Sequence, residues 1–483
     1  MNPSYGAKIA PVSKVFGYLL ALSVLVFPRD VVFASQQANS RQSLDQKFQS
    51  AAAQYESGHY SEAATQLESL LRQAPDSFEI HELLGLAYSA QSHDDKGNPH
   101  LQKAVRLKPS DVAARTNLAA SFMRIGKPDL ALPQFQKAAE LAPESFDANH
   151  NFGEAYVRLG KIPLAIPFLE RAQKIKPSSY DNGYDLALAY IVTNRLPDAR
   201  QLIQDLLKQK NSAELHNLLG QVEEKDGQFI AAANEYEAAA HMDPSETNLF
   251  DWGSELLVHR TLEPAIQIFQ QAVERYPNSA RLHIALGMSL YSRGNYDDAV
   301  KSLLKAVDLA PADPRCYFFL SRAYDSSPTQ ADEVIDRFGR FAELQPRDAH
   351  AQYYLAMSLW KGKRAQDPTV DLSQVEALLK KSIALDAKIP EAHLQLGNLY
   401  SDRSNFTASI PEYQRALQLD DDLADAHYRL GQAYVRTGDK ARGQEQLEIY
   451  QRLRAQHLSD VDKQKAEIRQ FVYSSKDAPS AKQ

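Results

Sequence analysis

Four residues near the start of the chain have side chains that could hold a metal ion: His93, Asp94, Asp95 and His100. Imidazole and carboxylate groups are common ligands of divalent cations. The residues fall, however, in a turn expected between two helices, where polar side chains are ordinary. We therefore interpret them as a solvated turn and predict no metal site.

The sequence lacks the familiar catalytic and cofactor-binding motifs. It has no glycine-rich phosphate loop and no Cys-x-x-Cys pair. His81 and Glu82 begin a His-Glu-x-x-His pattern, but Gly85 stands where the second histidine would be required. We therefore predict no catalytic residues, no cofactor and no enzymatic activity.

Cys316 is the single cysteine, so the chain can form no internal disulfide. It stands beside Tyr317, Phe318 and Phe319 in a segment with helical spacing of apolar residues. This setting favours a buried, inert thiol over a reactive or dimerising one. Packing alone must then hold the fold.

The elements that carry these residues follow a repeat marked by proline. The spacing is 34 residues in a first series and 33, 34 and 35 in a second. The two series are Pro75, Pro109, Pro143 and Pro177, then Pro244, Pro277, Pro311 and Pro346. A period of about 20 to 50 residues is typical of a solenoid, in which each repeat buries its apolar face by stacking on the next. Function is then expected on a surface.

Small residues recur at fixed positions within the repeat. With each proline numbered thirty-two, position eight is mostly glycine, as in Gly85, Gly153 and Gly287, and positions twenty and twenty-seven are mostly alanine. Glycine inside a helix costs about 1 kcal/mol relative to alanine, so its recurrence indicates close packing. We expect position eight of the first helix to pack against the alanine at position twenty of the second. Gly126 and Gly160 are placed to end first helices, and the prolines to end second helices.

This pattern resembles the tetratricopeptide repeat, which combines the small residue, an aromatic residue at position eleven, the two alanines and the terminal proline. The resemblance covers about twelve repeats, from Leu44 to His457. It implies an all-α fold, a right-handed α-solenoid of helix-turn-helix units. Repeats one to nine span residues 44–346, and repeats ten to twelve span residues 347–457.

Three departures from the pattern interrupt its spacing. The fifth repeat ends in Asn211 where proline is expected. The ninth repeat has Arg322 at position eight, and the tenth contains an insertion near residues 361–372. We expect the array to bend at these places.

The resemblance also implies a concave groove lined by the first helices. Side chains at positions two, five, six, nine, twelve and thirteen tend to face it in this family. These positions are polar in the first part of the chain and become aromatic later, which is typical of recognition surfaces. The alternative is that many of the rings pack between helices. The candidate groove residues are Asn117, Asn151, Glu154, Arg158, Tyr184, Asp185, Phe250, Tyr291, Tyr353, Trp360, Gln395, Asn398, Tyr428 and Arg429.

The two ends of the chain differ from the repeats. Residues 1–34 resemble a secretory signal peptide, with lysines before an apolar run and a small residue at Ala34, where we expect cleavage. An uncleaved N-terminal anchor is the alternative. Residues 35–43 are a polar linker, and residues 458–483 are expected to form a capping helix and a disordered tail. The mature chain would be exported, to a periplasm or the extracellular space, with no stable membrane span.

Charge and composition limit the partners. The formal net charge of −7 and the absence of a basic stripe argue against nucleic acid. The sequence therefore predicts a noncatalytic scaffold of the cell envelope that binds a protein or peptide in its groove. The alternative is an accessory or regulatory component of envelope polysaccharide or protein export, binding glycan or an enzyme. The oligomeric state is left open.

Overall fold

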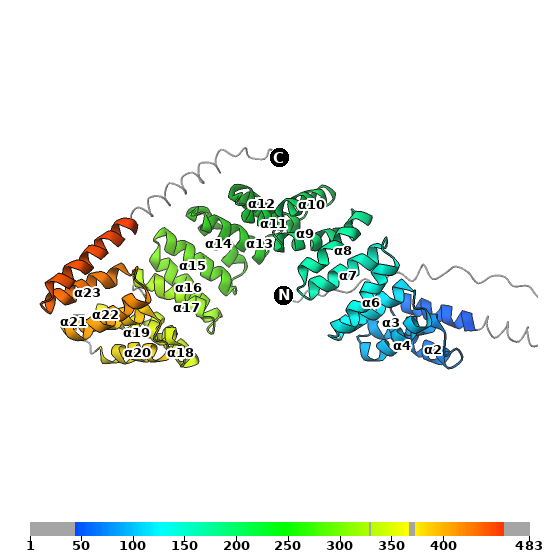
Figure 1. The fold of residues 1–483 in the computed structure, drawn as a ribbon, viewed down its shortest axis with the longest axis horizontal. Coiled ribbons are helices and arrows are strands. Elements are labelled where there is room, and N and C mark those ends of the chain that lie inside the picture. The colour runs from blue at the N-terminus through cyan, green and yellow to red at the C-terminus, as the bar shows by residue number, and fades with distance from the viewer. Residues whose placement is uncertain (1–43, 328–329, 367–371, 458–483) are drawn as a thin grey trace, which may run out of the picture. The chain divides into compact units, whose positions relative to one another are not determined.

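A computed structural model describes residues 44–327, 330–366 and 372–457. Helices are the only regular elements in these ranges and form twelve consecutive pairs, which confirms the predicted all-α repeat array. The chain divides into two compact units between Asn211 and Ser212, where the fifth repeat lacks its proline. Within each compact unit, successive helices lie side by side (Figure 1).

The helices of the two compact units follow one another with short turns. The first compact unit contains a helix at residues 44–56, α2 (Tyr60–Leu71), α3 (Phe78–Ala90), α4 (Asp94–Leu107), α5 (Val112–Arg124), α6 (Pro128–Leu141), α7 (Phe146–Arg158), α8 (Ile162–Ile175), α9 (Tyr180–Val192) and α10 (Leu196–Gln209). The second contains α11 (Ala213–Lys225), α12 (Phe229–Met242), α13 (Glu246–Val258), α14 (Leu262–Arg275), α15 (Ala280–Arg293), α16 (Tyr296–Leu309), α17 (Pro314–Ser326), α18 (Ala331–Leu344), α19 (Ala349–Gln366), α20 (Ser373–Leu385), α21 (Pro390–Asp402), α22 (Phe406–Leu419), α23 (Ala424–Arg436) and a helix at residues 440–457. Odd-numbered helices are the first helices of their repeats.

The first helices begin at residues that cap them. The side chains of Ser77, Asp111 and Ser145 each accept a hydrogen bond from the backbone N–H three residues further on. Such a cap stabilises a helix by about 1 kcal/mol. Gly126 and Gly160 follow the first helices with φ of +69° and +67°, so the predicted helix-ending glycines are confirmed. With the cap numbered zero, the small residue falls at position eight.

The glycine at position eight makes room for a large side chain, not for the alanine predicted at position twenty. A Cβ placed on Gly153 would lie 2.6 Å from Leu169 Cδ2, and one on Gly253 would lie 2.7 Å from Phe269 Cε1. In both repeats the large residue stands sixteen positions after the glycine, on the second helix. The helices therefore approach closely because one ring or isobutyl group fills the place of a missing side chain.

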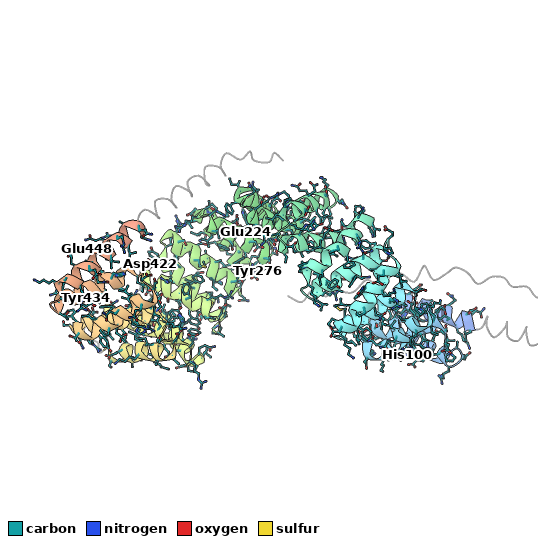
Figure 2. The ribbon with its side chains drawn as sticks, in the orientation of Figure 1. His100, Glu224, Tyr276, Asp422, Tyr434 and Glu448 are labelled. Carbon is teal, nitrogen blue, oxygen red and sulfur yellow. The ribbon has the colours of Figure 1, made fainter. Side chains whose placement is uncertain are left out.

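A polar side chain at position four joins each of several repeats to the one before it. Each of four such side chains donates a hydrogen bond to the backbone carbonyl oxygen six residues earlier, at 2.9 to 3.0 Å. They belong to His81, Asn149, Tyr317 and His427. For the first three residues that carbonyl belongs to the repeat-ending proline. The other ring nitrogen of His81 lies 3.0 Å from Nδ1 of His100. Figure 2 labels His100, which belongs to α4. One side chain thus connects the preceding turn to both helices of its own repeat.

The ninth repeat has a different register from the one predicted. Asp313 caps α17, so position eight is Ser321, and the placement of Arg322 there was wrong. The cause is one extra residue after α17: α17 and α18 are one residue further apart than α13 and α14. Counting back from Pro346 therefore shifted the numbering by one. Phe318, Phe319 and Arg322 move to positions five, six and nine.

Several sequence predictions concern the remaining parts of the chain. The signal peptide, the linker, the C-terminal cap and the tail lie outside the described residues. The insertion of the tenth repeat is seen in part, because α19 continues to Gln366 and is longer than the other first helices. Among the described residues, no helix is both long and apolar enough to cross a membrane.

Candidate functional site

The first helices of neighbouring repeats contact one another within each compact unit. They form the rows α3, α5, α7, α9 and α13, α15, α17, α19. Side chains at positions five, six, nine, twelve and thirteen of these helices, such as Met288 and Tyr291 of α15, share one face of the row. We call it the first-helix face. It is the surface on which the sequence placed the candidate groove residues.

In the first compact unit, Asn117 supports a neighbouring carboxylate. Its Nδ2 donates a hydrogen bond to Glu82 Oε1 at 3.2 Å, which joins α5 to α3. Desolvation raises the pKa of Glu82 to about 7, and the bond from Asn117 opposes that rise. Asn117 is half-buried, as is Asn151 on α7. The amide of Asn117 is therefore used within the chain, where the sequence assigned it to a peptide.

Glu154, Arg158 and Asp185 lie together on the first-helix face. Arg158 Nη2 is 2.6 Å from Glu154 Oε1 on the same helix, α7. The pKa of Asp185 on α9 is raised to about 6, mainly by burial and also by the charge of Glu154, while His150 and Arg158 oppose the rise. Tyr184, next to Asp185, stacks on Tyr180 with ring centroids 6.3 Å apart. The charges of Arg158 and Glu154 are therefore paired with each other on this part of the face.

In the second compact unit, the surface combines rings with charge. The guanidinium carbon of Arg281 on α15 lies 3.6 Å from the ring centroid of Phe250 on α13. The neighbouring Asp251 accepts a hydrogen bond from Asn217 at 2.9 Å. Burial raises the pKa of Asp251, while Asn217 and the charge of Arg281 lower it. Phe250 is therefore half-covered by an arginine that has a carboxylate nearby.

A cleft of about 370 Å³ opens on the first-helix face between α15 and α17. Its lining residues are Met288, Tyr291, Ser292, Leu303, Phe318, Phe319 and Arg322. Phe318 is 42% exposed and Tyr291 37%, which is unusual for rings of this size. Phe318 and Phe319 meet edge to face with centroids 5.1 Å apart. The cleft is thus an open apolar recess with rigid walls.

Two aromatic candidates from α19 belong to the interior. Trp360 is 7% exposed and packs with Val375 and Leu379 of α20, so its predicted place on the binding surface is corrected. It stands at position twelve, like Tyr291, but α19 continues beyond it, and the second helix covers the ring. Tyr353 is half-buried beside Tyr354, and burial raises its pKa.

The last candidates form two local groups. Asn398 Nδ2 donates to Gln395 Oε1 at 3.1 Å, and Asn398 Oδ1 accepts from Tyr413 at 2.9 Å, within repeat eleven. On α23, Tyr428 lies 5.1 Å from Tyr450 between ring centroids, and Arg429 is 3.6 Å from Asp425. These side chains contact their own repeats and are not gathered with the cleft.

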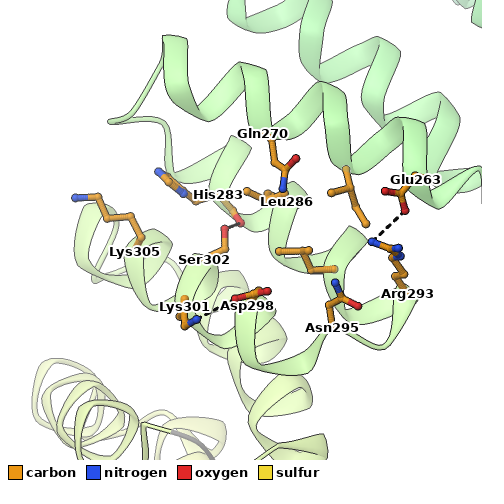
Figure 3. A pocket seen from close by; sticks show the side chains of 12 residues that line it. Glu263, Gln270, His283, Leu286, Arg293, Asn295, Asp298, Lys301, Ser302 and Lys305 are labelled. Carbon is orange, nitrogen blue, oxygen red and sulfur yellow. Dashed lines mark hydrogen bonds and ion pairs between the residues drawn. The ribbon is translucent and has the colours of Figure 1, made fainter.

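A second cavity, of about 410 Å³, is lined by α14, α15 and α16 (Figure 3). Two ion pairs form among its lining residues. Arg293 Nη1 lies 3.0 Å from Glu263 Oε2, and Lys301 Nζ lies 2.9 Å from Asp298 Oδ1. Ser302 donates to the carbonyl oxygen of His283 at 2.9 Å. Most polar groups of this cavity therefore have partners in the chain, and no Phe, Tyr or Trp is among its lining residues.

The residues first considered for chemistry have structural contacts. His93 precedes α4 and is exposed, as expected of a solvated turn, but Asp94, Asp95 and His100 lie in α4, so the predicted turn is wrong for these three. Asp95 is exposed, whereas Asp94 is buried, with its carboxylate bonded to Ser89, Ser121 and Arg124. The described residues contain no group of three or more His, Cys, Asp or Glu side chains placed to hold a metal ion.

Cys316 is fully buried in α17. Burial raises the pKa of its thiol to about 11, which keeps it protonated near neutral pH. The predicted burial of this thiol is therefore confirmed.

Sequence reasoning missed Phe318, Arg322 and Met288 as surface residues. The signal that could have found the first two is the 35-residue interval between Pro311 and Pro346, one longer than the interval before it. Numbering the ninth repeat forward from its cap, Asp313, would have placed both on the first-helix face. Met288 stands at position nine, which the resemblance places on the groove, but methionine is also common in helix interiors, so its residue type did not distinguish it.

Comparison with protein families finds the tetratricopeptide repeat along the chain. Tetratricopeptide-repeat models match residues 48–112, 116–180, 250–314 and 158–222, and a further model of the repeat matches residues 397–438. These matches cover more than half of the chain and fall in both compact units.

Individual relatives are distant. Human protein O-mannosyl-transferase TMTC1 is 25% identical over 157 residues, which are 32% of this chain and 17% of that protein. Human mitochondrial import receptor subunit TOM70 is 22% identical over 202 residues, 40% of this chain and 32% of that protein. The chain thus spans less than a third of the length of these relatives. The crystal structure of yeast Tom70 is 15% identical, with 89% of this chain and 96% of that chain covered and a TM-score of 0.37.

Proposed function

This chain belongs to the tetratricopeptide-repeat family, and we propose that it is a noncatalytic scaffold that binds peptide or protein partners on its first-helix face. The observation that carries the proposal is the cleft between α15 and α17. Its exposed rings, Tyr291 and Phe318, stand on the surface of a rigid pair of helices.

The chemistry of the cleft is that of a protein-binding hot spot. Tyrosine and arginine are enriched at such spots, and tyrosine brings large contact area while it loses little conformational freedom on binding. Burying one exposed ring under a partner contributes roughly 1.5 to 3 kcal/mol. Tyr291, Phe318 and Arg322 are thus suited to anchor one segment of a partner, while the polar part of the face adds specificity.

We further propose that the scaffold acts in the cell envelope after export. The support is the signal-peptide pattern of residues 1–34, together with a single cysteine that leaves the fold independent of disulfides. Mass spectrometry of the protein purified from its source would test the compartment. A mature N-terminus at Ser35 in the exported fraction is expected, and an intact Met1 in the cytosol would contradict it.

Crosslinking in the envelope tests the binding function. The wild-type chain and a Tyr291→Ala, Phe318→Ala double variant would each be expressed in place of the native protein, crosslinked and purified. Partners should be retained by the wild type and lost from the double variant, because the cleft has lost both exposed walls.

The matched control is Lys301→Ala, which alters the second cavity on the other side of α15 and α16. It should retain every partner. Equal retention by the double variant and the wild type would remove the cleft from the binding surface. Circular dichroism would verify that both variants stay helical.

A further inference from the structure

The cleft has an apolar interior built around a glycine. A Cβ on Gly287 would lie 2.5 Å from Leu303 Cγ, so the missing side chain lets Leu303 of α16 reach between the first helices. Leu303 is 1% exposed and lines the cleft. Met288 and Phe319 complete the apolar walls. The recess is therefore suited to an aliphatic or aromatic side chain, and it offers that side chain few polar groups to displace.

Arg322 gives the cleft a charge at its edge. Its guanidinium carbon lies 5.4 Å from the ring centroid of Phe318, one helical turn away on α17. A guanidinium stacked on a ring by its face keeps the N–H groups along its edge available for a carboxylate. Among the described residues, no carboxylate forms an ion pair with Arg322. The nearest acid along α17, Asp325, is paired with Lys361 at 2.5 Å.

Other arginines of the first-helix face differ in this respect. Arg158 is paired with Glu154 at 2.6 Å, and Arg429 lies 3.6 Å from Asp425. Arg281 also stacks on a ring, but its charge acts on the neighbouring Asp251. Arg322 therefore places a cation at the edge of an apolar recess, and no described carboxylate forms an ion pair with it. A carboxylate on a bound ligand would therefore meet a cation at the edge of the recess.

We propose that the cleft between α15 and α17 binds a peptide segment that presents an apolar side chain accompanied by a carboxylate. The apolar side chain enters the recess between Tyr291 and Phe318, and the carboxylate pairs with Arg322. Because one residue of an extended chain spans about 3.3 Å, the carboxylate stands within one or two residues of the apolar side chain. It is the side chain of an Asp or Glu within that segment. This proposal rests on the proposed function.

Selection from random peptides tests the ligand class without knowledge of the natural partner. The wild-type chain would be presented with two libraries of short peptides, one with free C-termini and one with amidated C-termini. Enriched peptides should contain an apolar residue next to Asp or Glu in the amidated library. Enrichment of apolar C-termini only in the free library would overturn the proposal, because the carboxylate would then be that of the chain end. A representative enriched peptide then serves as the probe for binding measurements.

The decisive measurement is a double-mutant cycle between Arg322 and the carboxylate of that probe. Arg322→Ala should weaken binding of the acidic peptide about tenfold, and Arg322→Lys should weaken it less. The same peptide with Asn or Gln in place of the acid should bind wild type and Arg322→Ala equally. Arg171→Ala is the matched control, because Arg171 lies 5.5 Å from the ring of Phe168 on a second helix and should have no effect.

The outcomes separate this inference from the proposed function. Enrichment of apolar but neutral peptides, with affinity lost in Phe318→Ala and unchanged in Arg322→Ala, would keep the binding surface and overturn the carboxylate. Failure of any peptide to bind wild type more tightly than the Tyr291→Ala, Phe318→Ala variant would overturn both. Since Arg322 is exposed, its substitution is not expected to disturb folding.

Discussion

Arg124 Nη2 lies 2.8 Å from Asp94 Oδ1, and this ion pair joins α5 to α4 across the junction of two repeats. The Asp94 side chain is only 7% exposed and also accepts hydrogen bonds from Ser89 on α3 and Ser121 on α5. Desolvation alone would raise the pKa of Asp94, but the bonds from Arg124 and the two serines outweigh it and lower the pKa. A residue with the appearance of a metal ligand therefore has a structural role.

Arg124→Ala should destabilise the first compact unit by about 1 to 3 kcal/mol, because it leaves a buried carboxylate without its cation. Urea unfolding followed by circular dichroism would measure the loss. The matched control is Lys208→Ala, which breaks an exposed pair with Asp205 and should change stability by less than about 1 kcal/mol. Equal effects of the two variants would show that the Asp94 network contributes little.

The same network predicts a dependence on pH. Because the folded-state pKa of Asp94 is below its ordinary value of 3.8, the ionised form stabilises the fold above that value. The stabilisation is lost as pH falls through the acid range. Asp94→Asn should flatten this part of the stability profile, and a profile that keeps its full slope would contradict the assignment.

Gly153→Ala should destabilise the protein by roughly 1 to 3 kcal/mol, although alanine is the better helix former. Its Cβ would lie 2.6 Å from Leu169 Cδ2, so the helices have to separate or Leu169 has to leave its position. Gly339 on α18 is the matched control, because a Cβ there would meet nothing within 4 Å. Gly339→Ala should stabilise by up to about 1 kcal/mol. Two changes of the same sign in the melting temperature would contradict the packing argument.

Glu82 should make the protein less stable as pH rises from the ordinary glutamate pKa of 4.5 to about 7. The folded state keeps the proton longer than the unfolded state, so the stability it contributes is complete below 4.5 and lost above about 7. Glu82→Gln should remove this decline and gain roughly 1 to 3 kcal/mol at pH 8. Asn117→Ala should move the titration of Glu82, followed by carboxyl NMR, to still higher pH. An unshifted titration would exclude the hydrogen bond between them.

The two tryptophans should differ in their access to solvent. Trp360 is buried between α19 and α20, whereas Trp252 is half-buried beside His241, with ring centroids 5.5 Å apart. In the Trp252→Phe variant, the remaining fluorescence of Trp360 should resist quenching by iodide. Trp360→Phe leaves Trp252, whose emission should be quenched more strongly. Equal quenching in the two variants would place Trp360 on the surface after all.

The period of the chain was predictable because a repeat places the same residue under the same steric constraint many times. Proline, glycine and alanine mark the helix ends and the close contacts, and the structure confirms a pair of helices for each period. The partner of the glycine was not predictable from the small residues. Leu169 and Phe269 fill equivalent places with different shapes, so no single residue type marks the position.

The candidate site was less predictable, because it depends on side chains that the repeat leaves free to vary. Arg322 stands nine residues after Asp313, at a position on the first-helix face. Because one extra residue follows α17, counting back from Pro346 placed Arg322 at position eight, which packs against the second helix. Trp360 occupies a surface position that a longer helix and α20 cover. Whether a ring is a wall of a cleft or part of the interior depends on the following helix, which the residue itself does not reveal.

The bonds from position four to the preceding carbonyl have a consequence for which residues a junction between repeats tolerates. His81, Asn149 and Tyr317 have different chemistry, yet each donates to the same backbone acceptor at the end of the repeat before it. Where position four has no side-chain donor, as at Gly183 and Leu249, the proline carbonyl accepts a hydrogen bond from Gln173 or Tyr276 instead. A junction can therefore change its donor without leaving the backbone acceptor unpaired, because side chains from more than one position reach it.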